Sequence, residues 1–85
     1  MITNIGVYIL KSKRTKKYYI GSSINLEGRS KRHFSELKNN VHHNMNLQNI
    51  YNKYGEKDVS FMVVKYFKYI ENARKLEDKL IKKIF

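Results

Sequence analysis

Glu77 is the residue whose position most directly suggests chemistry. Residues 69–85 have the spacing of a helix, and at about 100° per residue Glu77 falls in the middle of its apolar arc. The rest of that arc is Ile70, Ala73, Leu80, Ile81 and Ile84, with the lysines at 75, 79, 82 and 83 opposite. An ionised carboxylate on a buried face is costly unless it is paired or bound to a metal. Two interpretations stand, a buried Glu–Arg or Glu–Tyr pair and a divalent-metal ligand at the floor of a cleft. We favour the ligand, because Mg²⁺ often needs only one or two carboxylates.

Arg29 and three histidines supply the other side chains that could take part in a reaction. His33 lies one turn after Arg29 on a predicted helix, so the two share a flank. From position alone Arg29 is equally well explained as a solvated side chain, and a lone histidine is more often structural than catalytic. His42 and His43 lie at the junction of two predicted helices. They lack the further Cys or acidic ligands of a zinc site, and His43 is interpreted as a surface residue.

Two short tyrosine-bearing runs predict a β-hairpin that would position these groups. The runs are Ile5–Lys11 and Lys17–Ile20, whose β-branched and aromatic residues suit a half-buried strand. The segment between them is polar and basic. Period-two alternation puts Tyr8 on the opposite face from Val7. Tyr8 and Tyr19 could therefore approach each other across a shared face, in a register that the sequence leaves open.

The rest of the chain predicts three helices and one further strand. We expect a turn at Gly21–Ser23, a helix from the N-cap Asn25 to about Lys38, a helix from about Asn44 to Tyr54 that ends at Gly55, a strand Val59–Phe67 and a final helix Tyr69–Phe85. The Phe61–Val64 run is apolar on both faces, as expected when helices cover both sides of a sheet. The order ββααβα predicts an α+β fold, with a small three-stranded antiparallel sheet flanked by three helices.

Charge and composition narrow the class of partner. The 85 residues carry a net charge of +11, and this length leaves room for one domain with a thin core. The chain has no cysteine, which excludes disulfides and thiolate metal sites. No apolar run approaches the ~20 residues that span a bilayer. The charge indicates a polyanionic partner, with nucleic acid favoured over a membrane surface, and a merely solubilising lysine surface is the alternative.

A resemblance to a known family follows from the spacing of these residues. Gly6-Val7-Tyr8 and Tyr19-Ile20-Gly21 stand about ten residues apart, and Arg29, His33 and Glu77 follow in order. This set resembles the GIY-YIG endonuclease domain, most closely the catalytic domains of phage-type homing endonucleases. The likeness covers nearly the whole chain and includes His42, Leu47-Gln48 and Asn52-Lys53-Tyr54-Gly55.

The resemblance implies a divalent-metal-dependent endodeoxyribonuclease that hydrolyses a phosphodiester bond. Arg29 would hold the scissile phosphate, and Glu77 would bind one Mg²⁺ or Mn²⁺. Tyr8 and Tyr19 would position or activate the attacking water. His33 would orient a phenol or accept a proton, and His42 would be a support residue. Which of Tyr8, Tyr19 and His33 is the general base stays open.

The resemblance also bears on partners and on the extent of the protein. Double-stranded DNA is the expected partner, and the domain is expected to be monomeric without a membrane partner. Composition, and not the resemblance, predicts an intracellular, cytoplasmic protein of a phage, virus or low-GC bacterium. The phosphate backbone of the DNA would be contacted by basic side chains from two clusters, namely Lys13, Arg14, Lys16, Lys17, Lys31 and Arg32. The family often has an asparagine beyond its last helix and separate DNA-targeting segments. We therefore expect residues 1–85 to be a single catalytic domain from a larger nuclease.

Two rival interpretations are a non-catalytic nucleic-acid-binding module with the same fold and a structural protein–protein module. The side-chain arrangement discriminates among the three, because a catalytic domain requires Tyr8, Tyr19, Arg29 and Glu77 to converge on one cleft.

Overall fold

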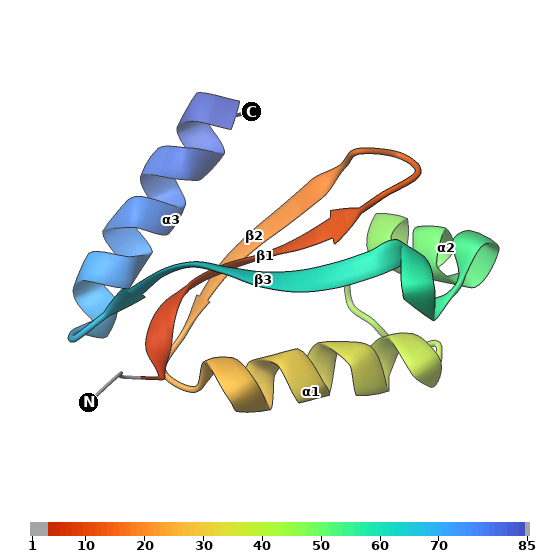
Figure 1. The fold of residues 1–85 in the computed structure, drawn as a ribbon, viewed down its shortest axis with the longest axis horizontal. Helices are drawn as coiled ribbons and strands as arrows, with labels where there is room; N and C mark the ends of the chain where they lie inside the picture. The colour runs from red at the N-terminus through yellow and green to blue at the C-terminus, as the bar shows by residue number, and fades with distance from the viewer. Residues whose placement is uncertain (1–3, 85) are drawn as a thin grey trace.

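The computed structural model describes residues 4–84, with side chains up to residue 82 (Figure 1). The elements in chain order are β1 (Ile5–Ser12), β2 (Tyr18–Ser23), α1 (Leu26–Lys38), α2 (Met45–Tyr54), the short 3₁₀ helix η1 (Glu56–Asp58), β3 (Val59–Phe67) and α3 (Ile70–Ile84). The predicted order ββααβα is confirmed, and η1 is an addition. The predicted end of the last helix, Phe85, lies outside the described residues. None of the described helices has the length and apolarity to cross a bilayer.

The sheet has the strand order β2-β1-β3 and is antiparallel throughout. Tyr8 pairs with Gly21, and Leu10 pairs with Tyr19, so the two tyrosines share a face and lie diagonal to each other. This register resolves the point that the sequence left open. A bulge interrupts the β1–β3 pairing between Val7 and Tyr8. The central strand thus carries Tyr8, and β2 forms a free edge beside it.

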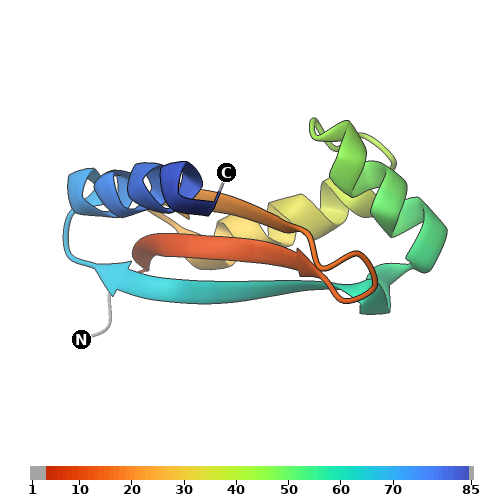
Figure 2. The same ribbon diagram turned by 90° about the horizontal axis from the view of Figure 1, so that it is seen from above.

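Helices pack on both faces of this sheet. In Figure 1, α1 lies below the sheet and α3 lies above it, and Figure 2 shows α2 beyond the end of the strands away from α3. The core between the sheet, α1 and α2 consists of Tyr8, Leu10, Leu26, Leu37, Leu47, Ile50 and Val59. On the other face Val7 and Ala73 are fully buried. The predicted N-cap at Asn25 is confirmed, because its side chain accepts from the Gly28 N–H. Asn44, the predicted start of the second helix, is also an N-cap, and its side chain accepts from the Leu47 N–H.

Two local predictions are wrong. Gly21–Ser23 is not a turn but the end of β2, because its residues pair with Gly6–Tyr8 of β1 and sheet pairing overrides the local turn preference. β3 is not covered on both faces, since Met62 is 48% exposed and Val64 is 46% exposed. The helix α3 packs mainly against β1 and β2, which leaves the outer face of β3 in solvent.

Candidate active site

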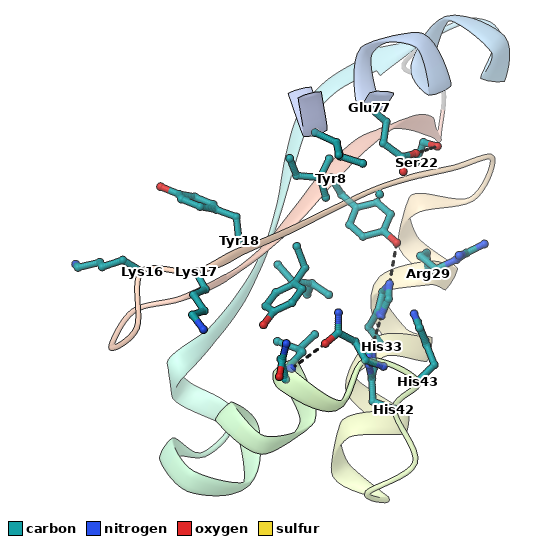
Figure 3. Close-up of a pocket in the computed structure, with 18 residues that line it drawn as sticks. Tyr8, Lys16, Lys17, Tyr18, Ser22, Arg29, His33, His42, His43 and Glu77 are labelled. Atoms are coloured by element: carbon teal, nitrogen blue, oxygen red, sulfur yellow. Dashed lines mark hydrogen bonds between the residues drawn. The ribbon is translucent and has the colours of Figure 1, made fainter. Parts of the chain in front are cut away.

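A cleft of about 890 Å³ lies along the edge strand β2 and is also lined by residues of α1 and α3. Figure 3 shows its lining as sticks. The five residues predicted to act in catalysis all line it, namely Tyr8, Tyr19, Arg29, His33 and Glu77. The predicted support residue His42 lines it as well. The structure thus brings together side chains that lie up to 69 positions apart in the sequence, as the catalytic interpretation requires.

Tyr8 is 5% exposed, and its ring stacks on Phe61 with centroids 4.7 Å apart. Across the strand pair its ring lies over Gly21, where a Cβ atom would come within 2.5 Å of Tyr8 Cζ. The glycine of the Tyr-Ile-Gly run is therefore required by the tyrosine opposite it. Burial raises the pKa of the Tyr8 phenol, Arg29 opposes this by charge and hydrogen bonding, and the Glu77 carboxylate adds to it. Burial also raises the pKa of Tyr19.

A chain of hydrogen bonds leads from the Asn44 backbone to the Tyr8 hydroxyl, and Figure 3 draws its last bond, between His33 and Tyr8, as a dashed line. The Asn44 N–H lies 3.0 Å from His42 Nδ1. His42 Nε2 is 2.8 Å from His33 Nδ1, and His33 Nε2 is 2.8 Å from Tyr8 Oη. Each neutral imidazole has one donor and one acceptor nitrogen, so the Asn44 N–H, which can only donate, sets the direction of the whole chain.

In that direction His42 Nε2–H donates to His33 Nδ1, and His33 Nε2–H donates to the Tyr8 oxygen. Burial and the neighbouring His42 and Arg29 lower the pKa of His33 to about 4. Burial and His43 lower the pKa of His42 as well. Both rings are therefore neutral at pH 7. Of the two roles expected for His33, this geometry favours orienting the phenol over accepting its proton, because Nε2 already carries a hydrogen.

Buried amides hold this chain in place. Gln48, 3% exposed, accepts a hydrogen bond from the His42 backbone N–H at 3.0 Å. Its own amide nitrogen donates to the Leu37 carbonyl oxygen and to Asn52 Oδ1. Sequence reasoning placed Asn44 only at the start of a helix and gave no role to Gln48. One signal was available for Gln48: helical spacing places this polar residue on the buried side of α2, where its amide needs hydrogen-bond partners.

His43 was predicted to be a surface residue. Its side chain is exposed, yet it also lines the cleft and stacks on the His42 ring with centroids 4.5 Å apart. The exposure of His43 was predicted correctly, but its position at the cleft was not. Local periodicity does not specify the path of the chain between α1 and α2.

Glu77 is half-buried and accepts a hydrogen bond of 2.5 Å from Ser22 Oγ. The ion pairs among the described side chains do not include Glu77, so the alternative of a buried Glu–Arg pair is not found there. A carboxylate beside a hydroxyl at the wall of an open cleft offers oxygen donors. Such donors suit Mg²⁺ or Mn²⁺, which bind through few protein ligands and keep several waters.

A second group of potential ligands includes two residues that line the cleft, His33 and His42, and one that does not, Glu36. One ligand atom each from His33, Glu36 and His42 falls within 4.8 Å of the others. This set is richer in nitrogen than Mg²⁺ prefers. Both ring nitrogens of His33 and of His42 are already engaged in the hydrogen-bond chain. Glu77 therefore remains the better candidate for a hard divalent cation.

The six residues predicted to contact a DNA backbone divide into two groups. Lys16 and Lys17 line the cleft. The other four, Lys13, Arg14, Lys31 and Arg32, are exposed but do not line it. Lys31 pairs with Glu27 at 3.3 Å and Arg32 with Glu36 at 3.6 Å, one turn along α1.

Comparisons with known proteins agree with this arrangement. The family model of the GIY-YIG catalytic domain matches residues 4–84. Intron-associated endonuclease 1 of Enterobacteria phage T4 is 40% identical over 50 residues, which is 59% of this chain and 20% of that protein. The matched segment thus spans about a fifth of that relative's length.

Two solved structures are similar over nearly the whole chain. The catalytic domain of the homing endonuclease I-TevI has a TM-score of 0.82 at 28% identity, covering 93% of this chain and 86% of that one. A glutamate-to-alanine mutant of the I-TevI catalytic domain has a TM-score of 0.81 at 29% identity, covering 93% and 81%. The resemblance and the fold class predicted from the sequence are both confirmed by these matches.

Proposed function

Because the chain belongs to the GIY-YIG catalytic domain family, we propose that it is a divalent-metal-dependent endonuclease domain that hydrolyses phosphodiester bonds of double-stranded DNA. The observation that carries this proposal is the convergence of a carboxylate, a guanidinium and two phenols on one cleft. Catalysis of phosphoryl transfer depends mainly on positioning and on electrostatic stabilisation of charge, and these groups supply both.

Tyr8 is the better candidate for activating the attacking water. Its oxygen accepts the His33 Nε2–H, so its own hydroxyl hydrogen is free to point into the cleft. If Tyr8 loses that hydrogen, the phenolate keeps two stabilising neighbours, the His33 N–H and the Arg29 guanidinium. Arg29 opposes the burial that raises the Tyr8 pKa, although the net shift remains upward. Tyr19, on the same face of the hairpin, would orient the water together with Tyr8.

Arg29 would hold the scissile phosphate through its planar guanidinium and stabilise the added negative charge of the transition state. A Mg²⁺ or Mn²⁺ bound by Glu77, with Ser22 beside it, would neutralise phosphate charge and stabilise the departing 3′-oxygen. One cleft contains one such set of groups, so each catalytic event would cut one strand.

The test is nicking of supercoiled plasmid, with Mg²⁺ or Mn²⁺ against EDTA. We expect metal-dependent nicking that falls at least about 10²-fold in Glu77→Gln and in Arg29→Ala, the scale for losing one transition-state contact. Two controls are Glu71→Gln and Arg74→Ala, which change exposed residues of α3 that do not line the cleft. These should retain most of the wild-type rate.

Tyr8→Phe and Tyr19→Phe distinguish the two phenols, and we expect the larger loss of rate for Tyr8→Phe. A folded wild-type domain that binds DNA but does not nick it with either metal would refute the enzyme proposal. That result would favour the rival binding module.

A further inference from the structure

Asp58 is a buried carboxylate that does not line the cleft. It is 6% exposed and belongs to η1, directly before β3. Ser12 Oγ–H donates to its Oδ2 at 2.6 Å, and the Arg14 backbone N–H donates to its Oδ1 at 2.9 Å. Its backbone carbonyl accepts from the Lys13 N–H at 3.0 Å. These bonds reach Ser12, the last residue of β1, and Lys13 and Arg14 in the loop that follows it, so Asp58 anchors the start of the loop of residues 13–17.

The anchored loop is held in one conformation. Ser12 Oγ, itself bonded to Asp58, accepts from the Thr15 N–H at 3.2 Å. The Lys16 N–H donates to the Ser12 carbonyl, and the Ser12 N–H donates to the Lys17 carbonyl. Lys16 has a φ of 63°, a left-handed conformation that costs energy for any residue with a Cβ. A connection between two strands does not need this degree of restraint, which suggests that the loop conformation has a use of its own.

The loop is also strongly basic and lies at the cleft. Lys13, Arg14, Lys16 and Lys17 are four of the chain's 18 basic residues. The ion pairs within the part of the chain that the structure describes involve none of these four. Figure 3 shows Lys16 and Lys17 on the side of the cleft away from Arg29. A DNA phosphate backbone that contacts Arg29 would therefore meet a second group of basic side chains, Lys16 and Lys17, on the opposite side of the cleft.

We propose that residues 13–17 are a pre-formed clamp for the phosphate backbone of DNA, and that Asp58 is the positioning residue that holds the clamp. The proposal rests on the proposed function and adds to it a specific second contact, through Lys16 and Lys17, on the side of the scissile phosphate opposite Arg29. Holding the loop in advance lowers the entropy lost on binding. Asp58 thus increases affinity for a polyanion although it carries a negative charge itself.

Duplex binding in EDTA tests the clamp without cleavage, using a fluorescent DNA duplex titrated at several NaCl concentrations. For Lys16→Gln/Lys17→Gln we expect weaker binding and a slope of log K against log salt that is smaller by about 1.8, since each phosphate contact contributes about 0.9. The charge-matched control is Lys75→Gln/Lys79→Gln on the exposed side of α3, which should leave the slope unchanged. Equal effects of the two double variants would overturn the clamp.

Asp58→Ala gives the sharper test, because it raises the net charge by one. Simple electrostatics predicts tighter DNA binding for this variant, whereas the clamp predicts weaker binding, with Kd rising about three- to tenfold and the salt slope moving toward that of the double lysine variant. The control is Asp78→Ala, which makes the same charge change at an exposed residue paired with Lys82 and should bind as tightly as wild type or tighter. A Kd for Asp58→Ala at or below the Asp78→Ala value would refute the proposal.

Ser12→Ala provides a charge-neutral second variant if Asp58→Ala fails to fold. It removes the hydroxyl that joins Asp58 to Thr15, and Kd should again rise, whereas an unchanged Kd would overturn the anchor. Failure of the clamp and failure of the enzyme proposal remain distinguishable. Plasmid nicking with wild-type affinity in the Lys16/Lys17 variant would refute the clamp alone. DNA binding that weakens in the Lys16/Lys17 variant, without any nicking by the wild type, would refute the proposed nuclease function alone.

Discussion

Gly21→Ala is the substitution whose consequence follows most directly from the structure. The new Cβ would lie 2.5 Å from Tyr8 Cζ and 3.0 Å from Tyr8 Cε1. Ordinary van der Waals contact begins near 3.4 Å, so the phenol end of the ring must move by about 1 Å. The hydrogen bond between Tyr8 Oη and His33 Nε2 is 2.8 Å long. A displacement of that size takes it to the limit at which a contact no longer counts as a hydrogen bond.

Two losses of different size should result. Overpacking of this kind typically costs about 1–3 kcal/mol, which a domain of this length tolerates because its total stability is about 4–13 kcal/mol by the usual per-residue range. Nicking should fall further, by about 10²-fold, because a 1 Å misplacement of a catalytic group can cost that much. Urea unfolding and plasmid nicking, measured at a temperature where the variant is folded, give the two numbers.

Gly55→Ala is the matched control. Gly55 has a φ of +88°, and a Cβ there would meet nothing within 4 Å. Gly55→Ala should therefore lose about 1–3 kcal/mol through backbone strain alone, because φ 88° with ψ 177° is a conformation that is almost restricted to glycine, and it should keep the wild-type nicking rate. In a Tyr8→Leu background Gly21→Ala should cost less stability, because the ring that it strikes is gone. Additive stability losses in that pair, or a Gly21→Ala domain with wild-type rate, would show that the reasoning about Tyr8 and Gly21 is wrong.

Three further predictions concern stability. The pKa of His33 is lowered from 6.5 to about 4, so between these values the unfolded chain binds a proton that the folded chain does not. The free energy of unfolding should therefore fall as the pH drops from about 6.5 to about 4, by up to about 3 kcal/mol, and equal urea midpoints at pH 7.5 and 4.5 would contradict this. Gln48→Leu leaves the His42 N–H and the Leu37 carbonyl without their partner and should cost at least about 2 kcal/mol in a urea unfolding experiment, whereas a neutral effect would show that water replaces the amide. Met62→Gln on the exposed face of β3 should change stability by no more than about 0.5 kcal/mol, and a larger loss in thermal unfolding would mean that this face is covered.

The fold could be predicted from the sequence because its local signals agree with its tertiary contacts. Asn25, Asn44 and Gly55 mark helix ends where the structure has them. The errors arose where long-range pairing decides. Gly21–Ser23 looks like a turn until β1 is placed beside it, and the apolar Met62 and Val64 look buried until α3 is found to lie over the other strands.

The site was predictable as a set of residues and not as a network. Spacing and family resemblance indicate Tyr8, Arg29 and Glu77. No sequence pattern predicts the hydrogen bond from the Asn44 backbone N–H to His42, which sets the orientation of the His42 and His33 rings. Asp58 is likewise an ordinary loop aspartate until its hydrogen bonds to Ser12 and Arg14 are known. The proposed roles of the site residues stay predictions until the variants are measured. The expected targeting segment beyond residue 85 also stays a prediction.

The central position of β1 has a consequence for the timing of activity during synthesis. β1 leaves the ribosome before the other strands of the sheet, and β3, which pairs with one of its edges, does not begin until Val59. At about 5–20 residues per second, that wait lasts about 3–10 s, during which one edge of β1 has no partner. The Glu77 carboxylate follows later still. A nascent chain would therefore possess its phenols and guanidinium before it possesses its proposed metal ligand. If the proposed function holds, the chain could not cut nucleic acid near the ribosome until synthesis had passed Glu77.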